Sequence, residues 1–322
     1  MDPHLFLADL EEKPRRLADL AAALRADDPW APLGDLDAPV VLLGMGSSHY
    51  AGQVAAARLR HARVPAVAEL AASDLLPGLP PGTLVLAVSA SGGSRETVDA
   101  VRRLRATESG ARFAALTNRD GTELESLCEV TVGMRAGEER GGVACRSFQH
   151  TLALLLALEA RMTGGPDVPS LLDRAGEASA HLLDTRDDWL PELSAAVLGP
   201  DGTHVAAPAR RLSSAWQSAL MLREGPRLPA YGCETADWSH VDVYLTKTTD
   251  YRMLLLAGSR WEDELVSWMR ERRSTLVALG ADVPGAALTL RYPHDDVDDV
   301  RLLTESLVAE LVAARAWSAG ER

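Results

Sequence analysis

Two turns rich in glycine and serine are the places where this sequence could hold an anion. Residues 44–48 read Gly-Met-Gly-Ser-Ser, and residues 89–94 read Ser-Ala-Ser-Gly-Gly-Ser. Each turn follows a short apolar run and precedes a helical pattern. Its N–H groups and hydroxyls would therefore lie at the start of a helix, where the helix dipole favours negative charge. We predict a phosphate site formed by Ser47, Ser48, Ser89, Ser91 and Ser94.

Other interpretations of these turns are open to test. In the simplest one, Ser94 only caps its helix, and Gly92 and Gly93 make the bend. Neither turn has the GxxxxGK[ST] pattern of a P-loop. Residues 44–46 begin like a dinucleotide fingerprint with Glu69 as the downstream acid, but His49 stands where the third glycine would be. The dinucleotide interpretation is therefore disfavoured.

An acid and a histidine further along the chain are candidates for proton transfer. Glu224 ends a predicted helix, where the dipole disfavours a carboxylate, and His240 lies in the polar loop Asp-Trp-Ser-His. A carboxylate that moves a proton between two carbons needs a partly dry pocket that brings its pKa toward neutrality. From the residues alone, a surface glutamate and an exposed histidine remain the alternatives.

The scarcity of lysine limits covalent chemistry. Lysine occurs only at positions 13 and 247, so an imine-forming residue would have to be Lys13 or Lys247. The three cysteines, Cys128, Cys145 and Cys233, show no CxxC spacing. That pattern disfavours a disulfide framework or structural zinc and is typical of a reducing cytoplasm. No metal or cofactor is expected.

The charge balance excludes some classes of partner. Acidic residues outnumber basic ones, 46 to 33, for a net charge of -13, which would repel nucleic acids and anionic membrane surfaces. The first residues mix acidic and basic side chains, unlike a signal peptide. The longest apolar run, residues 152–158, is too short to cross a bilayer. We expect a cytoplasmic protein with no nucleic-acid or membrane partner.

The elements that must position these residues alternate between strand and helix, which predicts parallel sheets covered by helices. A leading helix is expected over residues 5–24, and a Gly-Pro-rich linker at 163–169. The expected strands are 39–43, 64–70, 83–88, 112–116, 129–132, 203–206, 252–256, 274–279 and 287–291. The other expected helices are 49–61, 95–107, 146–162, 170–197, 213–223 and 296–318. We predict two tandem α/β domains, 1–165 and 166–322.

The motifs of this chain resemble those of the double-SIS (sugar isomerase) proteins. They include the isomerase half of glutamine–fructose-6-phosphate aminotransferase and stand-alone fructosamine- or aminosugar-phosphate deglycases. The matching segments are GMGSSHYAG at 44–52, SASGGSRETV at 89–98, GEERGGVACRSF at 137–148, and SALMLREG at 218–225 with His240 downstream. The resemblance runs through nearly the whole chain. It implies two flavodoxin-like α/β/α sandwiches, each with a parallel sheet.

The resemblance also implies a substrate and residue roles. The phosphate of a sugar 6-phosphate would lie on Ser48, Ser89, Ser91 and Ser94, with Ser47 near the sugar hydroxyls. Glu224 would move a proton between C1 and C2, and His240 would assist ring opening from the neighbouring subunit of a homodimer. The complete expected binding set is Gly46, Ser47, Ser48, Ser89, Ala90, Ser91, Ser94, Glu139, Val143 and Ala144.

Departures from the family pattern bear on the reaction. The aminotransferases have a lysine four residues before the catalytic glutamate and another in the C-terminal tail; this sequence has neither. No glutaminase domain is evident, so glutamine-dependent synthesis is not expected. Ala90 replaces a glutamine of the serine turn. We expect an aldose–ketose isomerase; the alternatives are an aminosugar or fructosamine 6-phosphate deaminase or deglycase, and a sugar-phosphate sensor without turnover.

Overall fold

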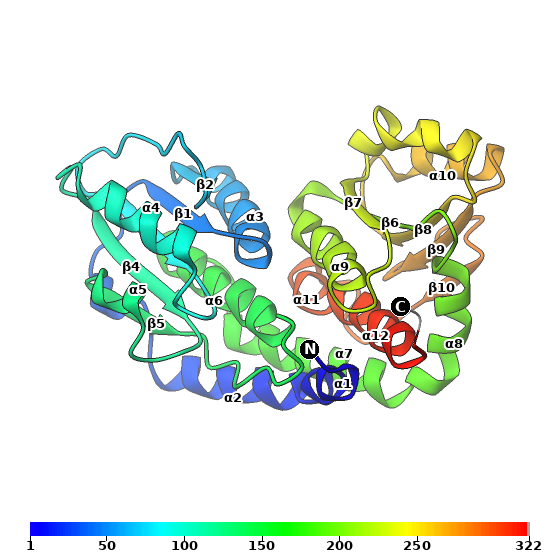
Figure 1. The fold of residues 1–322 in the computed structure, drawn as a ribbon, viewed down its shortest axis with the longest axis horizontal. Coiled ribbons are helices and arrows are strands. Elements are labelled where there is room, and N and C mark those ends of the chain that lie inside the picture. Colours follow the sequence, from blue (N-terminus) through cyan, green and yellow to red (C-terminus); the bar gives the residue numbers. More distant parts are fainter. Residues whose placement is uncertain (321–322) are drawn as a thin grey trace. The chain divides into compact units, whose positions relative to one another are not determined.

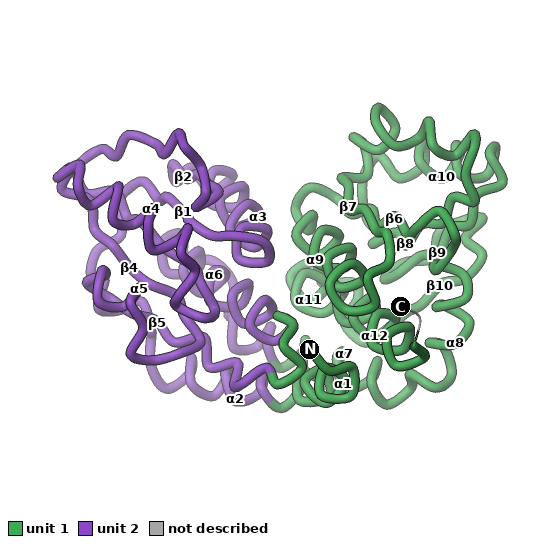
Figure 2. The backbone as a smooth tube through the Cα atoms, viewed as in Figure 1, with its two compact units in different colours: residues 1–15, 140–145, 173–322 green, residues 16–139, 146–172 purple. Residues whose placement is uncertain are grey.

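The computed structural model describes residues 1–320 and contains two five-stranded parallel sheets (Figure 1). Contacts divide the chain into two compact units (Figure 2). Unit 1 comprises residues 1–15, 140–145 and 173–322, and unit 2 comprises residues 16–139 and 146–172. Because the units interleave along the chain, this division does not test a boundary between residues 165 and 166, which stays a prediction.

The sheet of unit 2 has the strand order β2-β1-β3-β4-β5. Its strands are β1 (Val40–Gly44), β2 (Ala66–Leu70), β3 (Leu84–Val88), β4 (Arg112–Thr117) and β5 (Val130–Gly133). β1 and β3 are buried along their whole length. Strands covered on both faces read as continuous apolar runs rather than alternating ones, and this is why the sequence revealed them.

Helices pack on this sheet through alternate strand residues. Val41 and Leu43 of β1 share a hydrophobic cluster with Val98 and Val101, whereas Leu42 points to the side where α3 packs. The helices that lie wholly or mainly in unit 2 are α2 (Lys13–Ala26), α3 (Ser47–His61), α4 (Arg95–Arg105), α5 (Glu123–Ser126) and α6 (Arg146–Thr163), with a 3₁₀ turn, η1 (Ala31–Leu33).

The sheet of unit 1 has the order β7-β6-β8-β9-β10. This is the same order as β2-β1-β3-β4-β5 in unit 2, with each strand numbered by its place in the chain. Its strands are β6 (Thr203–Ala207), β7 (Ala230–Glu234), β8 (Arg252–Leu256), β9 (Thr275–Leu279) and β10 (Leu288–Leu290). Its helices are α1 (Pro3–Glu11), most of α7 (Val168–Asp184), α8 (Arg186–Val197), α9 (Leu212–Glu224), α10 (Glu262–Glu271), α11 (Asp298–Thr304) and α12 (Ser306–Ser318). Short 3₁₀ turns are η2 (Ala209–Arg211), η3 (Asp237–Ser239) and η4 (Asp242–Lys247). The predicted class, two parallel-sheet α/β units, is confirmed.

Three helices predicted as continuous are each two helices. The leading helix breaks at Glu12, because Pro14 has no N–H for the Leu10 carbonyl and the Glu12 N–H bonds that carbonyl instead. The pattern over 170–197 breaks at Thr185, and that over 296–318 breaks at Glu305. The second of these helices also begins before residue 170: Ser170 lies inside α7, where its N–H and hydroxyl donate to the Asp167 carboxylate.

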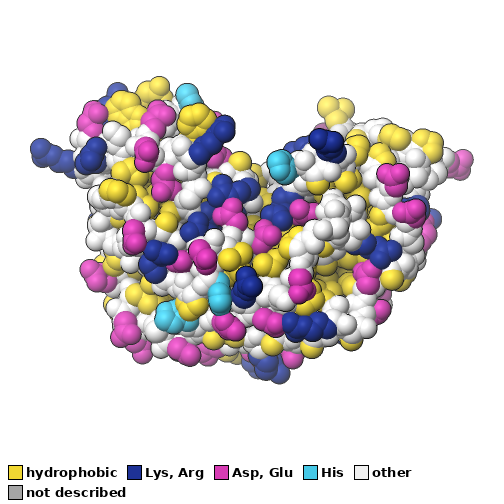
Figure 3. All heavy atoms as spheres, turned by 180° about the vertical axis from the view of Figure 1, so that it is seen from behind, with side chains coloured by type: hydrophobic (Ala, Val, Ile, Leu, Met, Phe, Trp, Pro, Cys, Tyr) yellow, Lys and Arg dark blue, Asp and Glu magenta, His cyan; other side chains and the backbone are white. Residues whose placement is uncertain are grey.

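Within residues 1–320, no helix is long and apolar enough to cross a membrane. On the face shown in Figure 3, acidic and basic side chains are interspersed.

Candidate functional site

The two serine-containing turns lie at neighbouring strand ends in unit 2. Strands β1 and β3 pair in parallel, although β2 lies between them in sequence. The chain leaves β1 through residues 44–48 and leaves β3 through residues 89–94. The strand order reverses between β1 and β3, and ligands of open α/β sheets bind in the crevice at such a switch point.

The second turn is held by the neighbouring strand β4 and the residues that follow it. The Ser89 N–H donates to Leu116 O (3.0 Å), and Ala90 O accepts from the Asn118 N–H (3.1 Å). Ser89 is buried and Ser91 is exposed, and their hydroxyl oxygens are 3.5 Å apart. Two hydroxyls therefore lie side by side at the end of β3.

Gly92 allows this turn to form. Its φ is +62°, and a Cβ built there would lie 2.4 Å from Thr122 Cγ2. Its N–H donates to Ser89 O (3.0 Å), and its carbonyl accepts from the Leu124 N–H (3.3 Å). Any side chain at this position would be strained and would also collide with Thr122.

The structure confirms that Ser94 caps α4. Its hydroxyl oxygen accepts from the Thr97 N–H (3.4 Å), and the hydroxyl donates to Glu96 Oε2 (3.0 Å). Glu96's own backbone N–H, followed by the Ser94 hydroxyl, lowers the pKa of this exposed carboxylate. A phosphate that used the Ser94 hydroxyl would take the place of Glu96.

The first turn ends at a helix that no side chain caps. Gly46 is the N-cap of α3, and no side-chain hydrogen bond closes this end. Ser47 and Ser48 are the first two residues of the helix, and both are half-buried. Gly44 packs tightly against them, since a Cβ there would lie 2.9 Å from Ser48 Cβ. An anion could bind this helix end without displacing a side chain.

Asn118 helps to hold the serine turn in place, and the sequence analysis did not predict it. It follows β4, where its Oδ1 accepts from the Ala136 N–H (2.9 Å) and its Nδ2 donates to Gly137 O (2.7 Å). Together with its bond to Ala90, these contacts tie the serine turn to the segment that leads to Glu139. A polar residue directly after a buried strand was the available signal. Glu139 accepts from the Ser147 N–H (3.0 Å) at the start of α6.

The other predicted site residues belong to unit 1. Glu224 is the last residue of α9 and is half-buried, and His240 follows η3 and is exposed. Val143 as a whole is 1% exposed, whereas its neighbour Ala144 is half-buried. Ala144 O accepts from Gln217 Nε2 (2.8 Å) on α9. The segment 140–145 and the glutamate-bearing helix are therefore in direct contact.

An aromatic stack packs behind the turn before His240, and its Tyr231 end is exposed. Trp238 is fully buried, and its Nε1–H donates to the Tyr251 hydroxyl (2.7 Å). The Tyr251 ring lies 3.9 Å from the His204 ring, which stacks in turn on Tyr231 at 5.1 Å. Burial lowers the pKa of His204 to about 4, so this imidazole is neutral at physiological pH.

The equivalent crevice of unit 1, between β6 and β8, is occupied by arginines. The Ala257 carbonyl accepts from Arg211 Nη2 (2.5 Å) and Arg301 Nη1 (3.1 Å), and Gly258 O accepts from Arg210 Nη2 (2.9 Å). Arg211 is also paired with the buried Glu305. This strand end presents carbonyls that guanidinium groups already satisfy. The crevice of unit 2 presents N–H groups and hydroxyls instead.

The two lysines differ in accessibility. Lys13 and Glu310 form an ion pair in which both side chains are 0% exposed. Lys247 is exposed on η4, with its ammonium 5.7 Å from the centre of the Tyr244 ring. Imine chemistry by a lysine of this chain would therefore require Lys247.

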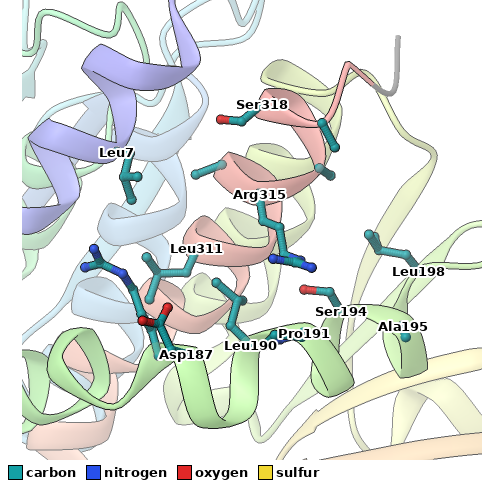
Figure 4. A pocket seen from close by; sticks show the side chains of 14 residues that line it. Leu7, Asp187, Leu190, Pro191, Ser194, Ala195, Leu198, Leu311, Arg315 and Ser318 are labelled. Carbon is teal, nitrogen blue, oxygen red and sulfur yellow. The ribbon is translucent and has the colours of Figure 1, made fainter.

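Unit 1 also has a groove of about 670 Å³ between α8 and α12 (Figure 4). Apolar side chains such as Leu190, Leu198 and Leu311 line most of it, and Ser194 and Arg315 add polar groups. It contains none of the predicted site residues.

Part of this chain matches a known protein family. Residues 38–161, which include both serine-containing turns, match the SIS domain. The glutamine–fructose-6-phosphate aminotransferase (isomerizing) of Aeropyrum pernix is 28% identical over 76% of this chain and 42% of that protein. The Corynebacterium glutamicum aminotransferase is 30% identical over 75% of this chain and 40% of that protein. The chain thus spans less than half of these two relatives.

Solved structures share the fold over nearly the full length. The tagatose-6-phosphate ketose/aldose isomerase of Escherichia coli superposes with a TM-score of 0.78 at 18% identity, covering 98% of this chain and 93% of that one. The glucosamine-6-phosphate deaminase of Thermotoga maritima gives 0.76 at 14% identity, with 98% and 95% covered. The likeness therefore includes the sheets of both units.

Proposed function

We propose that this chain is a phosphosugar isomerase that binds a sugar 6-phosphate and moves a proton between C1 and C2. The observation that carries the proposal is the pair of serine-containing turns at the adjacent ends of β1 and β3. The uncapped start of α3 and the hydroxyls of Ser89 and Ser91 supply donors for a phosphate there. The arginine-filled crevice of unit 1 offers no comparable place.

In this proposal Glu224 is the base. After ring opening assisted by His240, the carboxylate takes the C2 proton of the open-chain aldose and leaves an enediol over C1 and C2. It returns the proton to C1 while a proton passes from O2 to O1, so no atom is gained or lost. This reaction needs no lysine. It is therefore compatible with a chain in which Lys13 is buried in an ion pair with Glu310.

A second candidate, release of ammonia or an amine from an aminosugar or fructosamine 6-phosphate, would use the same proton transfer. The structural likeness to a glucosamine-6-phosphate deaminase favours keeping it. Both reactions fit a homodimer in which His240 serves the neighbouring subunit. A sensor without turnover would bind the same ligands and leave their protons in place.

The test is proton exchange in deuterated water. The wild type is incubated with hexose and hexosamine 6-phosphates, and C1 and C2 deuteration, isomer formation and ammonia release are followed by NMR. We expect exchange with at least one substrate, and Glu224→Gln should slow it by about 10²–10⁴, the range for loss of a general base. If the wild type bound a sugar phosphate tightly but exchanged no proton with any candidate, the protein would be a sensor without turnover. If Glu224→Gln exchanged as fast as the wild type, a residue other than Glu224 would be the base.

A further inference from the structure

The segment 140–145 is held at both ends by buried side chains from distant parts of unit 1. The Gly141 N–H donates to Asp9 Oδ2 (2.7 Å) on α1, and Ala144 O accepts from Gln217 Nε2 (2.8 Å) on α9. Asp9 is 1% exposed and Gln217 is 0% exposed. Hydrogen bonds shielded from water in this way restrict the backbone more than exposed ones do.

The helix that carries Asp9 is itself fixed. A Cβ built at Gly141 would lie 2.5 Å from Phe6 Cα, so the segment presses directly on α1. Lys13, just after α1, forms the buried ion pair with Glu310 of α12. Asp9 therefore projects from a helix tied to the last helix of the chain, which makes it a rigid support for Gly141.

Gln217 links the same segment to the proposed base. Gln217 and Glu224 are seven residues apart, so both lie on one face of α9, about two turns from each other. A carbonyl can only accept, so the Gln217 amide nitrogen must face Ala144. Its Oε1 is buried and has no hydrogen-bond partner among the described residues. A buried amide with an unsatisfied oxygen is costly for stability, which points to a role other than stability.

We infer that Asp9 and Gln217 are positioning residues that hold the segment 140–145 against the face of α9 that ends at Glu224. The inference rests on the proposed function, in which Glu224 is the base, and on the expectation from the sequence that Ala144 lines the sugar site. Displacing either side of a site by a small distance lowers the rate strongly. Loss of either contact should therefore weaken catalysis more than it weakens the fold.

The holding contacts are tested without ligand. Asp9→Leu removes the acceptor for Gly141, Asp9→Asn keeps one, and Gln217→Met keeps the length but removes the donor. Ser213→Ala is the matched control, since Ser213 is equally buried on α9 and its hydroxyl has no partner in the described chain. Asp9→Leu should speed hydrogen exchange of the Gly141 amide by about tenfold or more, and Gln217→Met should speed trypsin cleavage after Arg140 similarly. Asp9→Asn and Ser213→Ala should match the wild type.

Turnover and binding separate this inference from the proposed function. With fructose 6-phosphate or whichever panel sugar the wild type turns over, Gln217→Met should lower kcat/KM about tenfold or more. Affinity for inorganic phosphate should stay at the wild-type value, because the serine turns hold it. If the wild type turns over no sugar phosphate, the proposed function fails, and local exchange and cleavage still decide whether the segment is held. Unchanged exchange and cleavage in the variants would overturn the inference, as would loosening with wild-type kcat/KM. If Asp9→Leu does not fold, Gln217→Met and Ser213→Ala give the same decision.

Discussion

Ser91 and Ser94 differ in what their hydroxyls hold before any ligand binds. Ser91 is exposed, and its hydroxyl oxygen accepts a long bond from the Gly93 N–H (3.3 Å) and lies 3.5 Å from the Ser89 hydroxyl oxygen, whereas Ser94 caps α4. Ser91→Ala should leave the melting temperature almost unchanged and weaken sugar-phosphate binding by about 1.5–3 kcal/mol, the value of a charge-assisted bond. Ser94→Ala should also lose about 1 kcal/mol of stability with the cap.

Thermal shifts with and without ligand measure both effects. Ser126→Ala, at an exposed serine of α5, is the control and should resemble the wild type in both respects. If the Ser91→Ala, Ser94→Ala double variant showed the full ligand-induced shift of the wild type, the phosphate would not bind at this turn.

His204 should make the free energy of unfolding depend on pH. Burial lowers its pKa from 6.5 to about 4 in the folded protein, so between these values the unfolded chain binds more protons. The stabilising contribution is therefore complete above pH 6.5 and is lost as the pH falls to about 4. The loss amounts to about 3 kcal/mol, since each pKa unit corresponds to about 1.4 kcal/mol.

Urea denaturation of the wild type and His204→Phe between pH 7 and 4 measures this dependence. Phenylalanine keeps a ring for Tyr231 and Tyr251 but cannot be protonated, so the variant should lose less stability on acidification. Parallel pH profiles for the two proteins would show that His204 does not titrate as its burial requires.

At the scale of elements, the turn after β3 depends on one of its two glycines. Gly92 has a φ of +62° and lies against Thr122, whereas the nearest atom to a Cβ at Gly93 is 3.9 Å away. Gly92→Ala should destabilise the protein by about 1–3 kcal/mol, the usual range for a strained backbone position, and should weaken sugar-phosphate binding. Gly93→Ala is the matched control and should cost little. Equal effects in denaturation experiments would contradict this account of the turn.

The strands that form the core of each sheet were predictable because their burial on both faces leaves a continuous apolar run. β7 was missed for the opposite reason: it is an edge strand, and Tyr231 and its successors are half-buried or exposed. α10 was missed because its buried stripe consists only of Leu265 and Met269. The helix breaks at Thr185 and Glu305 could not be predicted, because no proline or glycine lies next to either residue in the sequence.

The candidate site, like the fold, was only partly predictable from the sequence. The serine turns were predictable because their composition, rich in glycine and serine directly after an apolar strand, stands out in the sequence. Asn118, Asp9 and Gln217 were not, because each acts on a backbone group far away in sequence. The distance from Asp9 to Gly141 is 132 residues, and only the folded chain brings them together.

At the scale of the whole molecule, one buried ion pair joins the two ends of the sequence. Lys13 and Glu310 are 297 residues apart and both are 0% exposed. Removing one partner leaves a buried charge, so Lys13→Met should cost about 3–5 kcal/mol of unfolding free energy. Lys13→Met with Glu310→Leu should recover most of that loss, because apolar packing replaces both charges. Urea titration of the three proteins measures this, and a single variant as stable as the wild type would contradict it.

The proposed homodimer, in which subunits share active sites, predicts the activity of a mixed dimer. If His240 serves the partner's site, a heterodimer of one Glu224→Gln subunit and one His240→Ala subunit contains one site with both changes and one site with neither. Each parent homodimer should be inactive, and the purified heterodimer, selected with two affinity tags, should regain about half of the wild-type activity. If Glu224 and His240 of the same chain worked together, both sites of the heterodimer would carry one change, and it would be as inactive as the parents. The heterodimer therefore decides whether a site is built within one chain or between two.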